Sequence, residues 1–314
     1  MKHIAIAGPT ASGKTELALA LARRLNSEII SADSRQIYRE LTVGTAKPKG
    51  MWHNGQYLVE NIPYHVVDFL PPDQTFDVFS FCEKSRALLN AQSNKPFIFA
   101  GGTGMYLHAF FIGIDKLPPA DETLRKELAD FAEKNGREAL HARLAENDPV
   151  SAAQIPAQNI HRVIRALEIY QLTGRPACEL KTGAFFQTEF SSKQVLFVYL
   201  NWDKELLHER ITRRTQAMLD PMLAETRTLL NKGFAPDCAG LKSLGYPEIL
   251  QWIDGKITRE ETLEKIIIRT RQYAKRQRTW FNRYKNILRL DITHPKEFDV
   301  EKISRQISEK HNSL

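Results

Sequence analysis

The eight residues at positions 8–15 have the composition and spacing of a phosphate-binding loop. In such a loop, glycines let backbone N–H groups converge on an anion, Lys14 adds a positive charge, and the Thr15 hydroxyl can ligate Mg²⁺ at the positive end of the next helix. We therefore expect the whole loop to bind a diphosphate: Gly8, Pro9, Thr10, Ala11, Ser12, Gly13, Lys14 and Thr15. This chemistry leaves open what the diphosphate is attached to.

Asp33 follows the apolar pair Ile29 and Ile30 and begins the segment Asp-Ser-Arg-Gln-Ile-Tyr. Open α/β sheets hold their ligands at the carboxyl ends of their strands, so we expect Asp33 to lie beside the phosphate loop. There it could serve as a general base or a metal ligand, and the alternative is that it caps the next helix. Asp68, which ends the stretch His-Val-Val-Asp, could likewise be a magnesium ligand or a turn residue.

Two other segments contain glycine and a hydroxyl. Residues 101–106 follow the apolar stretch 97–100, so they are expected to place small residues and the Thr103 hydroxyl on the same rim as the phosphate loop. A tight turn is the alternative interpretation. Residues 44–48, Gly-Thr-Ala-Lys-Pro, form a loop with one lysine, a pattern that is more often solvent-exposed than functional.

Residues 265–289 contain nine Lys or Arg residues and no Asp or Glu, with Tyr273, Trp280, Phe281 and Tyr284 between them. Cations that neutralise phosphates, beside rings able to stack on unpaired bases, meet the requirements for binding structured RNA or single strands. The alternative is a solvated helix face with its rings in the core. That alternative could explain the rings, but it does not explain the lack of acidic residues.

Arginines occur in two further places. Three follow the apolar stretch 195–200: Arg210, Arg213 and Arg214. One of them could reach back to the phosphate loop and clamp an anion. Arg162 and Arg165 alternate with an apolar stripe of helical spacing, so we expect both to face outward.

The spacing of the apolar stretches indicates the framework that must position these residues. Short apolar runs alternate with helical patterns, and the runs occupy residues 4–7, 29–30, 65–67, 97–100, 195–200 and 287–290. This alternation predicts an α/β fold of the P-loop NTPase type, with a mostly parallel sheet flanked by helices.

A long stretch without strand patterns interrupts this framework at residues 116–187. Asp121 can cap its first helix. We interpret the stretch as an inserted helical subdomain, because connections between parallel strands are usually much shorter. The alternative is that these helices pack on the sheet. The predicted division is therefore a core at 1–115, an insertion at 116–187 and the rest of the core at 188–314.

Composition limits the class of protein. The chain has 314 residues, 42% of them hydrophobic, and a net charge of +7 that weakly favours a polyanionic partner. Cys82, Cys178 and Cys238 form no CxxC pair, so neither a disulfide framework nor a cysteine zinc site is expected. The first strand leaves no room for a signal peptide, and no apolar run reaches the roughly 18 residues of a membrane span. We expect a cytoplasmic protein that is not inserted in a membrane.

Taken in order, the motifs resemble those of the tRNA dimethylallyltransferases, also called isopentenyltransferases. The resemblance runs from the first strand to about Tyr284 and involves residues 8–15, 33–38, 44–48, 101–106, 165–170, 245–246 and 272–277. It implies transfer of a dimethylallyl group from dimethylallyl diphosphate to N6 of the adenosine 3′ of the tRNA anticodon, with Mg²⁺ as cofactor. The rivals are a nucleotide or small-molecule kinase, which has no use for the acid-free basic run, and an RNA-binding module with a nucleotide switch.

The resemblance also implies residue roles in a monomeric enzyme. Asp33 accepts the proton of the attacking amine from a base flipped out of the anticodon loop, and Thr10, Lys14 and Arg214 stabilise the departing pyrophosphate. The residues expected to bind tRNA are Asp33, Ser34, Arg35, Gln36, Thr103, Arg125, Gln158, Asn159, Ile160, His161, Arg162, Lys242, Gly245, Tyr246, Gln272, Lys275 and Arg276.

Three places depart from the family pattern. Arg35 replaces a usual methionine, Asp220-Pro221 replaces Gly-Leu, and Pro-Ala-Gln-Asn at 156–159 replaces a His-Pro-Asn stretch. These departures concern local contacts with tRNA more than the chemistry.

Overall fold

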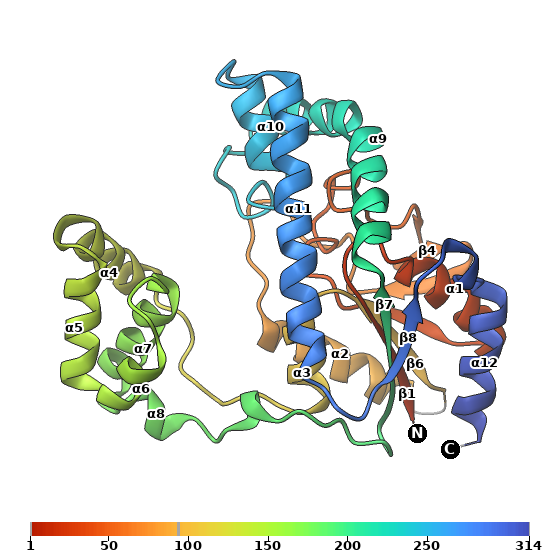
Figure 1. Ribbon diagram of the computed structural model, residues 1–314, viewed down its shortest axis with the longest axis horizontal. Helices are drawn as coiled ribbons and strands as arrows, with labels where there is room; N and C mark the ends of the chain where they lie inside the picture. The colour runs from red at the N-terminus through yellow and green to blue at the C-terminus, as the bar shows by residue number, and fades with distance from the viewer. Residues whose placement is uncertain (1, 93–94, 314) are drawn as a thin grey trace. The chain divides into compact units, whose positions relative to one another are not determined.

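The protein is described by a computed structural model that covers residues 2–92 and 95–313 (Figure 1). The chain forms two compact units, one within residues 1–112 and 188–314 and the other at Gly113–Gln187. The second unit begins three residues before the predicted insertion boundary at 116 and ends at the predicted position.

Within the described residues, the first unit contains an eight-stranded sheet with the order β3-β4-β5-β2-β6-β1-β7-β8. The strands are β1 His3–Ala7, β2 Glu28–Ser31, β3 Met51–His53, β4 Gln56–Val59, β5 Ile62–His65, β6 Phe97–Gly101, β7 Val195–Trp202 and β8 Leu288–Ile292. All pairings from β5 to β8 are parallel, and β3 and β4 join as antiparallel strands. The predicted α/β fold with a mostly parallel sheet is therefore confirmed.

Strand β5 was predicted in the wrong place, at the apolar run of residues 65–67. It covers Ile62–His65, and the chain then turns through Val66 and Asp68, which have positive φ values of 56° and 54°. Such values are incompatible with a continuing strand. The sequence analysis also missed β3 and β4, because strands of three and four residues are too short to show a clear alternation.

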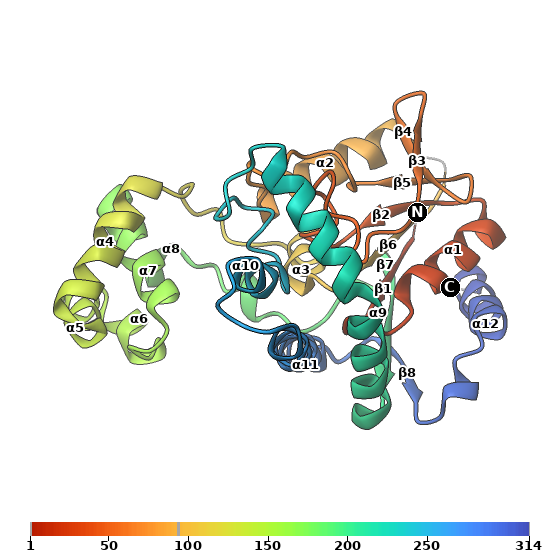
Figure 2. The ribbon, with the colours of Figure 1, turned by 90° about the horizontal axis from the view of Figure 1, so that it is seen from above.

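Helices cover both faces of the sheet. In the first unit they are α1 Lys14–Leu25, α2 Val78–Ala91, α3 Gly104–Phe111, α9 Lys204–Asn231, α10 Tyr246–Ile253, α11 Arg259–Asn282 and α12 Val300–Asn312, with 3₁₀ turn η2 at Pro295–Glu297. Helices α1 and α12 pack together beside the strands (Figure 2), whereas α3 contacts α2 and α11. In Figure 1, α9 continues upward from the end of β7 and α11 lies beside it.

The two faces bury different side chains, because successive residues of a strand point in opposite directions. In β6, Ile98 and Ala100 belong to an aliphatic core with Leu17 of α1 and Ile303 of α12. On the other face lies a cluster of rings: Phe99, Phe110, Phe111, Phe190, Phe197, Phe281 and Tyr284. The sheet is therefore packed between two hydrophobic cores. The polar loops that follow the strands lie at the ends of the sheet.

The second unit is helical throughout its regular structure. Its elements are α4 Glu122–Asn135, α5 Arg137–Asn147, α6 Pro149–Gln154, α7 Ile160–Thr173, α8 Ala177–Leu180 and η1 Ala184–Phe186. Leu140, Leu144 and Val163 form part of its own core. The Asp121 side chain accepts a hydrogen bond from Leu124 N at 2.9 Å, so Asp121 caps α4 as predicted.

One expectation about this unit is wrong. Arg162 is exposed as predicted, but Arg165 is half-buried and donates to Glu168 at 2.5 Å and to the Pro118 carbonyl at 2.6 Å. Glu168 is fully buried and also accepts from Arg125 at 2.9 Å. A buried carboxylate needs charged partners, which is why this arginine turns inward. No helix in the described part of the chain is both long and apolar enough to cross a membrane.

Candidate active site

The phosphate loop connects β1 to α1, and its shape depends on glycine. Gly13 has a φ of 87°, and a Cβ placed there would lie 2.4 Å from the ring of Phe298. Helix α1 begins at the next residue, Lys14, so the first N–H groups of the helix lie at the loop. The loop therefore leads into the beginning of a helix, as its spacing predicts, and its assignment to a diphosphate stays a prediction.

Side chains from distant elements hold this loop from outside. Trp202 Nε1 donates to the Ser12 carbonyl at 2.9 Å, and Arg210 Nε donates to the Ala11 carbonyl at 2.8 Å. Gln277 of α11 accepts from Thr10 N at 2.8 Å and donates to the Gly102 carbonyl at 2.9 Å. These bonds fix the loop before a ligand arrives, which reduces the reorganisation that binding requires.

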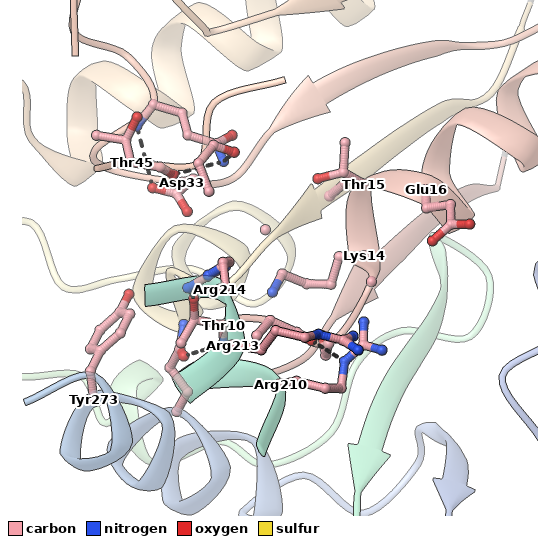
Figure 3. A pocket seen from close by; sticks show the side chains of 18 of the residues that line it. Thr10, Lys14, Thr15, Glu16, Asp33, Thr45, Arg210, Arg213, Arg214 and Tyr273 are labelled. Carbon is pink, nitrogen blue, oxygen red and sulfur yellow. Dashed lines mark hydrogen bonds between the residues drawn. The ribbon is translucent and has the colours of Figure 1, made fainter. Parts of the chain in front are cut away.

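Two cations, Lys14 of the loop and Arg214 of α9, lie together at the loop (Figure 3). Lys14 Nζ donates to the Pro9 carbonyl at 2.7 Å, and Arg214 donates to Thr10 Oγ1 at 2.5 Å. Burial, together with the repulsion of Arg214, lowers the pKa of Lys14 to about 8, although the nearby Asp33 carboxylate acts in the opposite direction. Burial also lowers the pKa of Arg214, but a guanidinium keeps its charge at neutral pH. An anion bound here would relieve the repulsion between these two cations.

A cavity of about 460 Å³ lies over the loop. Its lining includes residues 10–16 together with Gln36, Tyr64 and the three arginines of α9, Arg210, Arg213 and Arg214. Figure 3 shows these arginines and Lys14 on one side of the space and Asp33 on the other. The excess of positive groups suits a ligand with several negative charges.

Asp33 reaches this cavity from β2, although β6 lies between β2 and β1 in the sheet. A close approach makes this possible, since a Cβ on Gly101 at the end of β6 would lie 2.0 Å from the Ala32 carbonyl oxygen. Asp33 Oδ1 accepts from Arg35 N at 2.9 Å and from Gln36 N at 3.4 Å. The segment that follows is a turn and not a helix, so the helix-cap alternative is wrong.

A second cavity, of about 610 Å³, adjoins the first. Five residues line both: Thr10, Asp33, Thr45, Arg214 and Tyr273. A group bound at the phosphate loop and a group bound in the second cavity would therefore meet beside Asp33 and Arg214. This is the arrangement that a transfer reaction between two substrates needs.

Several residues predicted to bind tRNA line the second cavity: Asp33, Ser34, Arg35, Lys242, Gln272 and Arg276. Gln36 lines the first cavity, Thr103 Oγ1 accepts from Ser34 N at 3.0 Å, and Lys275 is exposed on α11. Tyr246, after Gly245, is fully buried and donates its hydroxyl to Glu225. The assignment of all these residues to tRNA binding stays a prediction.

The remaining predicted tRNA-binding residues belong to the second unit. Arg125 lies on α4 and pairs with Glu168, as described above. The others lie in the turn before α7 and in the first turn of that helix: Gln158, Asn159, Ile160, His161 and Arg162. The side chains of His161 and Arg162 are exposed, so they are accessible to a partner.

The alternatives left open by the sequence are settled for four side chains. Phe281 and Tyr284 are buried in the core and cannot stack on a base, whereas Tyr273 lines both cavities. Asp68 pairs with Lys47 at 2.5 Å and accepts from Trp52 Nε1 at 2.8 Å, so it is a turn residue held by structural partners. Lys47 is therefore buried, and its expected exposure is wrong.

Sequence reasoning missed Thr45, Gln277, Tyr64 and Glu16 as lining residues of the first cavity. Thr45 belongs to the segment 44–48, whose glycine and hydroxyl were the available signal. Gln277 belongs to the motif at residues 272–277, which was assigned to the path of the RNA and not to the phosphate loop. Only the fold brings α11 to the phosphate loop.

The described residues include no group of three or more His, Cys, Asp or Glu side chains that could hold a metal ion. Mg²⁺ does not require one, because it is usually held by one or two protein ligands together with phosphate oxygens. The Thr15 hydroxyl and the Asp33 carboxylate, which both line the first cavity, fit that pattern.

Comparisons with known proteins agree with this geometry. A family model described as IPP transferase matches residues 36–284, and one described as isopentenyl transferase matches residues 1–55. The chain belongs to the tRNA dimethylallyltransferase family. It is 53% identical to a tRNA dimethylallyltransferase of Elusimicrobium minutum, over 92% of this chain and 94% of that one.

Solved structures of the tRNA dimethylallyltransferase family have the same fold. A full-length tRNA isopentenylpyrophosphate transferase of Bacillus halodurans is 34% identical, with a TM-score of 0.67 over 99% of this chain and 97% of that one. A eukaryotic dimethylallyltransferase acting on tRNA is 26% identical, with a TM-score of 0.76 over 99% and 79%. The chain is therefore a prenyltransferase, and the kinase alternative is not favoured.

Proposed function

We propose that the chain transfers the dimethylallyl group of dimethylallyl diphosphate to N6 of the adenosine 3′-adjacent to the tRNA anticodon. The C–O bond to the diphosphate breaks, a C–N bond to N6 forms, and pyrophosphate leaves. The N6 amine loses one proton. The observation that supports this most is the meeting of two cavities at Asp33 and Arg214, one suited to a diphosphate and the other open to a base.

The phosphate loop would hold the leaving group. Its N–H groups, Lys14 and Arg214 face the space where negative charge grows as the C–O bond breaks. Because the loop and its cations are already fixed by hydrogen bonds, this stabilisation needs little rearrangement during the reaction. Arg210 lies over the Trp202 ring, 4.3 Å from its centroid, while donating to Ala11, so it supports the loop.

Thr15 would hold Mg²⁺ together with diphosphate oxygens, which leaves the Asp33 carboxylate free to act on the amine. When bound, the ion neutralises part of the charge on the leaving group. The helix start that carries Thr15 adds its own positive potential.

Asp33 would orient the N6 amine and accept its proton. The exocyclic amine of adenine is a poor nucleophile, so proton removal must accompany attack. The turn that fixes Oδ1 of Asp33 limits the side chain to one orientation at the junction of the cavities. Tyr273 could stack on the extruded base, since its ring lines both cavities.

The tRNA would contact the acid-free basic run and the inserted unit. Gln272, Lys275 and Arg276 are exposed on α11, and His161 and Arg162 are exposed on α7. Cationic side chains attract the phosphate backbone and make binding sensitive to salt. We also propose that the enzyme acts as a monomer in the cytoplasm.

Product analysis tests the proposal directly. Purified protein is incubated with tRNA, Mg²⁺ and dimethylallyl diphosphate, and the nucleosides are examined by mass spectrometry after digestion. We expect N6-dimethylallyladenosine, and none when the target adenosine is replaced by guanosine. A protein that yields no prenylated nucleoside but is stabilised against heat by ATP and not by dimethylallyl diphosphate would contradict the proposal.

A further inference from the structure

One carboxylate of helix α9 holds the backbone of the loop at residues 42–44. Glu225 Oε2 accepts from Thr42 N at 2.7 Å and from Val43 N at 2.8 Å. Glu225 Oε1 accepts from Gly44 N at 3.4 Å and from the Tyr246 hydroxyl at 2.5 Å. Three successive backbone N–H groups thus converge on one side chain.

All four contacts are donors, so the site needs an ionised carboxylate, which only accepts. Converging backbone N–H groups form the same kind of anion site that a phosphate loop offers to a ligand. Here the anion belongs to the chain itself. Burial and the nearby Glu225 carboxylate raise the pKa of the Tyr246 hydroxyl, which keeps it a donor at neutral pH.

Packing leaves this loop little freedom on its other sides. A Cβ on Gly44 would lie 2.6 Å from both the Tyr246 ring and the Met222 methyl group. Lys47, at the other end, is buried and bonds to Asp68 at 2.5 Å. The loop is therefore fixed at both ends.

Thr45 lies between these two fixed ends. Gln36 Nε2 donates to the Thr45 carbonyl at 3.4 Å and to the Ala46 carbonyl at 3.2 Å. Thr45 Oγ1 donates back to the Leu41 carbonyl at 2.5 Å, which turns its methyl group away from that bond. Thr45 lines both cavities, as Asp33 does.

We propose that Glu225 is a positioning residue for the transfer reaction, which sets the distance between the donor and the acceptor base. It does so by holding residues 42–44 so that Thr45 forms the wall where the two cavities meet. Glu225 follows Arg214 on the same helix by 11 residues, about 16 Å along the axis. Helix α9 thus carries both Arg214, which lies at the phosphate loop, and Glu225, which holds the loop that contains Thr45. This inference rests on the proposed function.

The test compares Glu225→Gln with the wild-type enzyme in steady-state prenyl transfer to tRNA. The amide has almost the same shape as the carboxylate. Its NH₂ group, however, is a donor, and it would lie opposite a donor of the loop or of Tyr246 where the carboxylate has an acceptor. We expect kcat to fall about tenfold, because a wall displaced by a fraction of an ångström separates the reacting atoms. The KM for dimethylallyl diphosphate should stay within about twofold, since Lys14 and Arg214 are untouched.

Tyr246→Phe provides a second, milder variant. It removes only the fourth donor and keeps the ring that packs on Gly44, so the protein should fold even if Glu225→Gln does not. We expect kcat to fall about threefold, again with little change in the KM for the donor.

Lys232→Ala is the matched control. Lys232 lies at the end of α9, and its Nζ is 2.7 Å from a carboxylate oxygen of Glu40, a residue just before the same loop. Both side chains are exposed. Exposed pairs contribute little, so kcat and thermal stability should stay at wild-type values.

The outcomes separate three cases. If Glu225→Gln and Tyr246→Phe keep wild-type kcat, or if their activity falls only in proportion to the unfolded fraction seen by circular dichroism, Glu225 does not position the reaction. If the variants stay folded and lose kcat while the donor KM is kept, the inference holds. If wild-type protein makes no prenylated nucleoside, the proposed function itself fails, and the inference fails with it.

Discussion

Two short glycine-containing loops lie where the two cavities meet, and both are rich in backbone N–H groups that can bind an anion. They use these groups in opposite ways. The phosphate loop, residues 8–15, brings the beginning of α1 and the Lys14 side chain to the first cavity, where Arg214 of α9 adds a second cation. The loop at residues 42–48 directs three N–H groups away, onto Glu225 of the same chain. The first is an anion site left for a ligand, and the second is filled permanently. The comparison supports the proposals that the first loop binds the diphosphate and that the second loop sets the geometry of the reaction.

Asp33→Ala should produce the largest effect, because Asp33 lies between the two loops and is the proposed base. Transfer should fall by about 1,000-fold or more, while tRNA affinity in a filter-binding assay stays nearly intact. Asp33→Asn is the matched control for shape, and it should be as inactive. Turnover within about tenfold of wild type, a barrier change of about 1.4 kcal/mol, would remove Asp33 from the role of base.

Substituting alanine for Gly13 and for Gly44 would distinguish the roles of the two loops. A methyl group at either glycine meets a neighbour, Phe298 in one case and Tyr246 with Met222 in the other. Gly13→Ala should raise the donor KM about 30-fold, and Gly44→Ala should lower kcat about 30-fold with the donor KM unchanged. Initial rates across a range of donor concentrations measure both. The same kinetic pattern in both variants would break the comparison.

Arg214→Ala should weaken donor binding, because it removes one of the two cations that face the loop. We expect the KM for dimethylallyl diphosphate to rise about tenfold to 30-fold. Arg227→Ala, at an exposed position on the same helix, is the control for changes in α9 itself. A saturation curve that does not move would exclude Arg214 from the diphosphate site.

Donor affinity should depend on pH through Lys14. Its pKa is lowered to about 8, so the free enzyme carries the ammonium below that pH and loses it as pH rises. The dissociation constant of dimethylallyl diphosphate should therefore rise between pH 8 and pH 9, by up to about tenfold. Calorimetric titrations at several pH values measure this. Lys14→Arg keeps its charge and should flatten the dependence, and an equally steep curve in that variant would assign the effect to another group.

Charge reversal on the basic helix should have the smallest effect on chemistry. Lys275→Glu with Arg276→Glu should weaken tRNA binding and reduce the slope of log affinity against log salt concentration by about 1 to 2. The rate at saturating tRNA should change little. An unaltered salt slope would show that this face is only solvated.

The phosphate loop could be predicted because its chemistry is local: a strand, eight residues and a helix start form one continuous segment. Asp33 was harder, since only the sheet order and the close approach of Gly101 bring β2 to the same cavity. Lys47 was assigned to solvent because its partner, Asp68, lies 21 residues away in a turn that was assigned to a strand. Arg165 turned inward for a similar reason, since buried Glu168 was not recognised as a charge in need of partners.

The sequence by itself determined the loop between the first strand and the first helix, the alternation of strands and helices, and the family. Each depends on residues close together in the chain or on ordered motifs. Only the tertiary structure decided which side chains share a cavity, that Gln277 and Arg210 support the phosphate loop, and that Glu225 occupies the N–H groups of the second loop. These contacts join residues more than 180 positions apart, and no local preference specifies such a pairing. They form because buried polar groups must find partners wherever the packed elements place them.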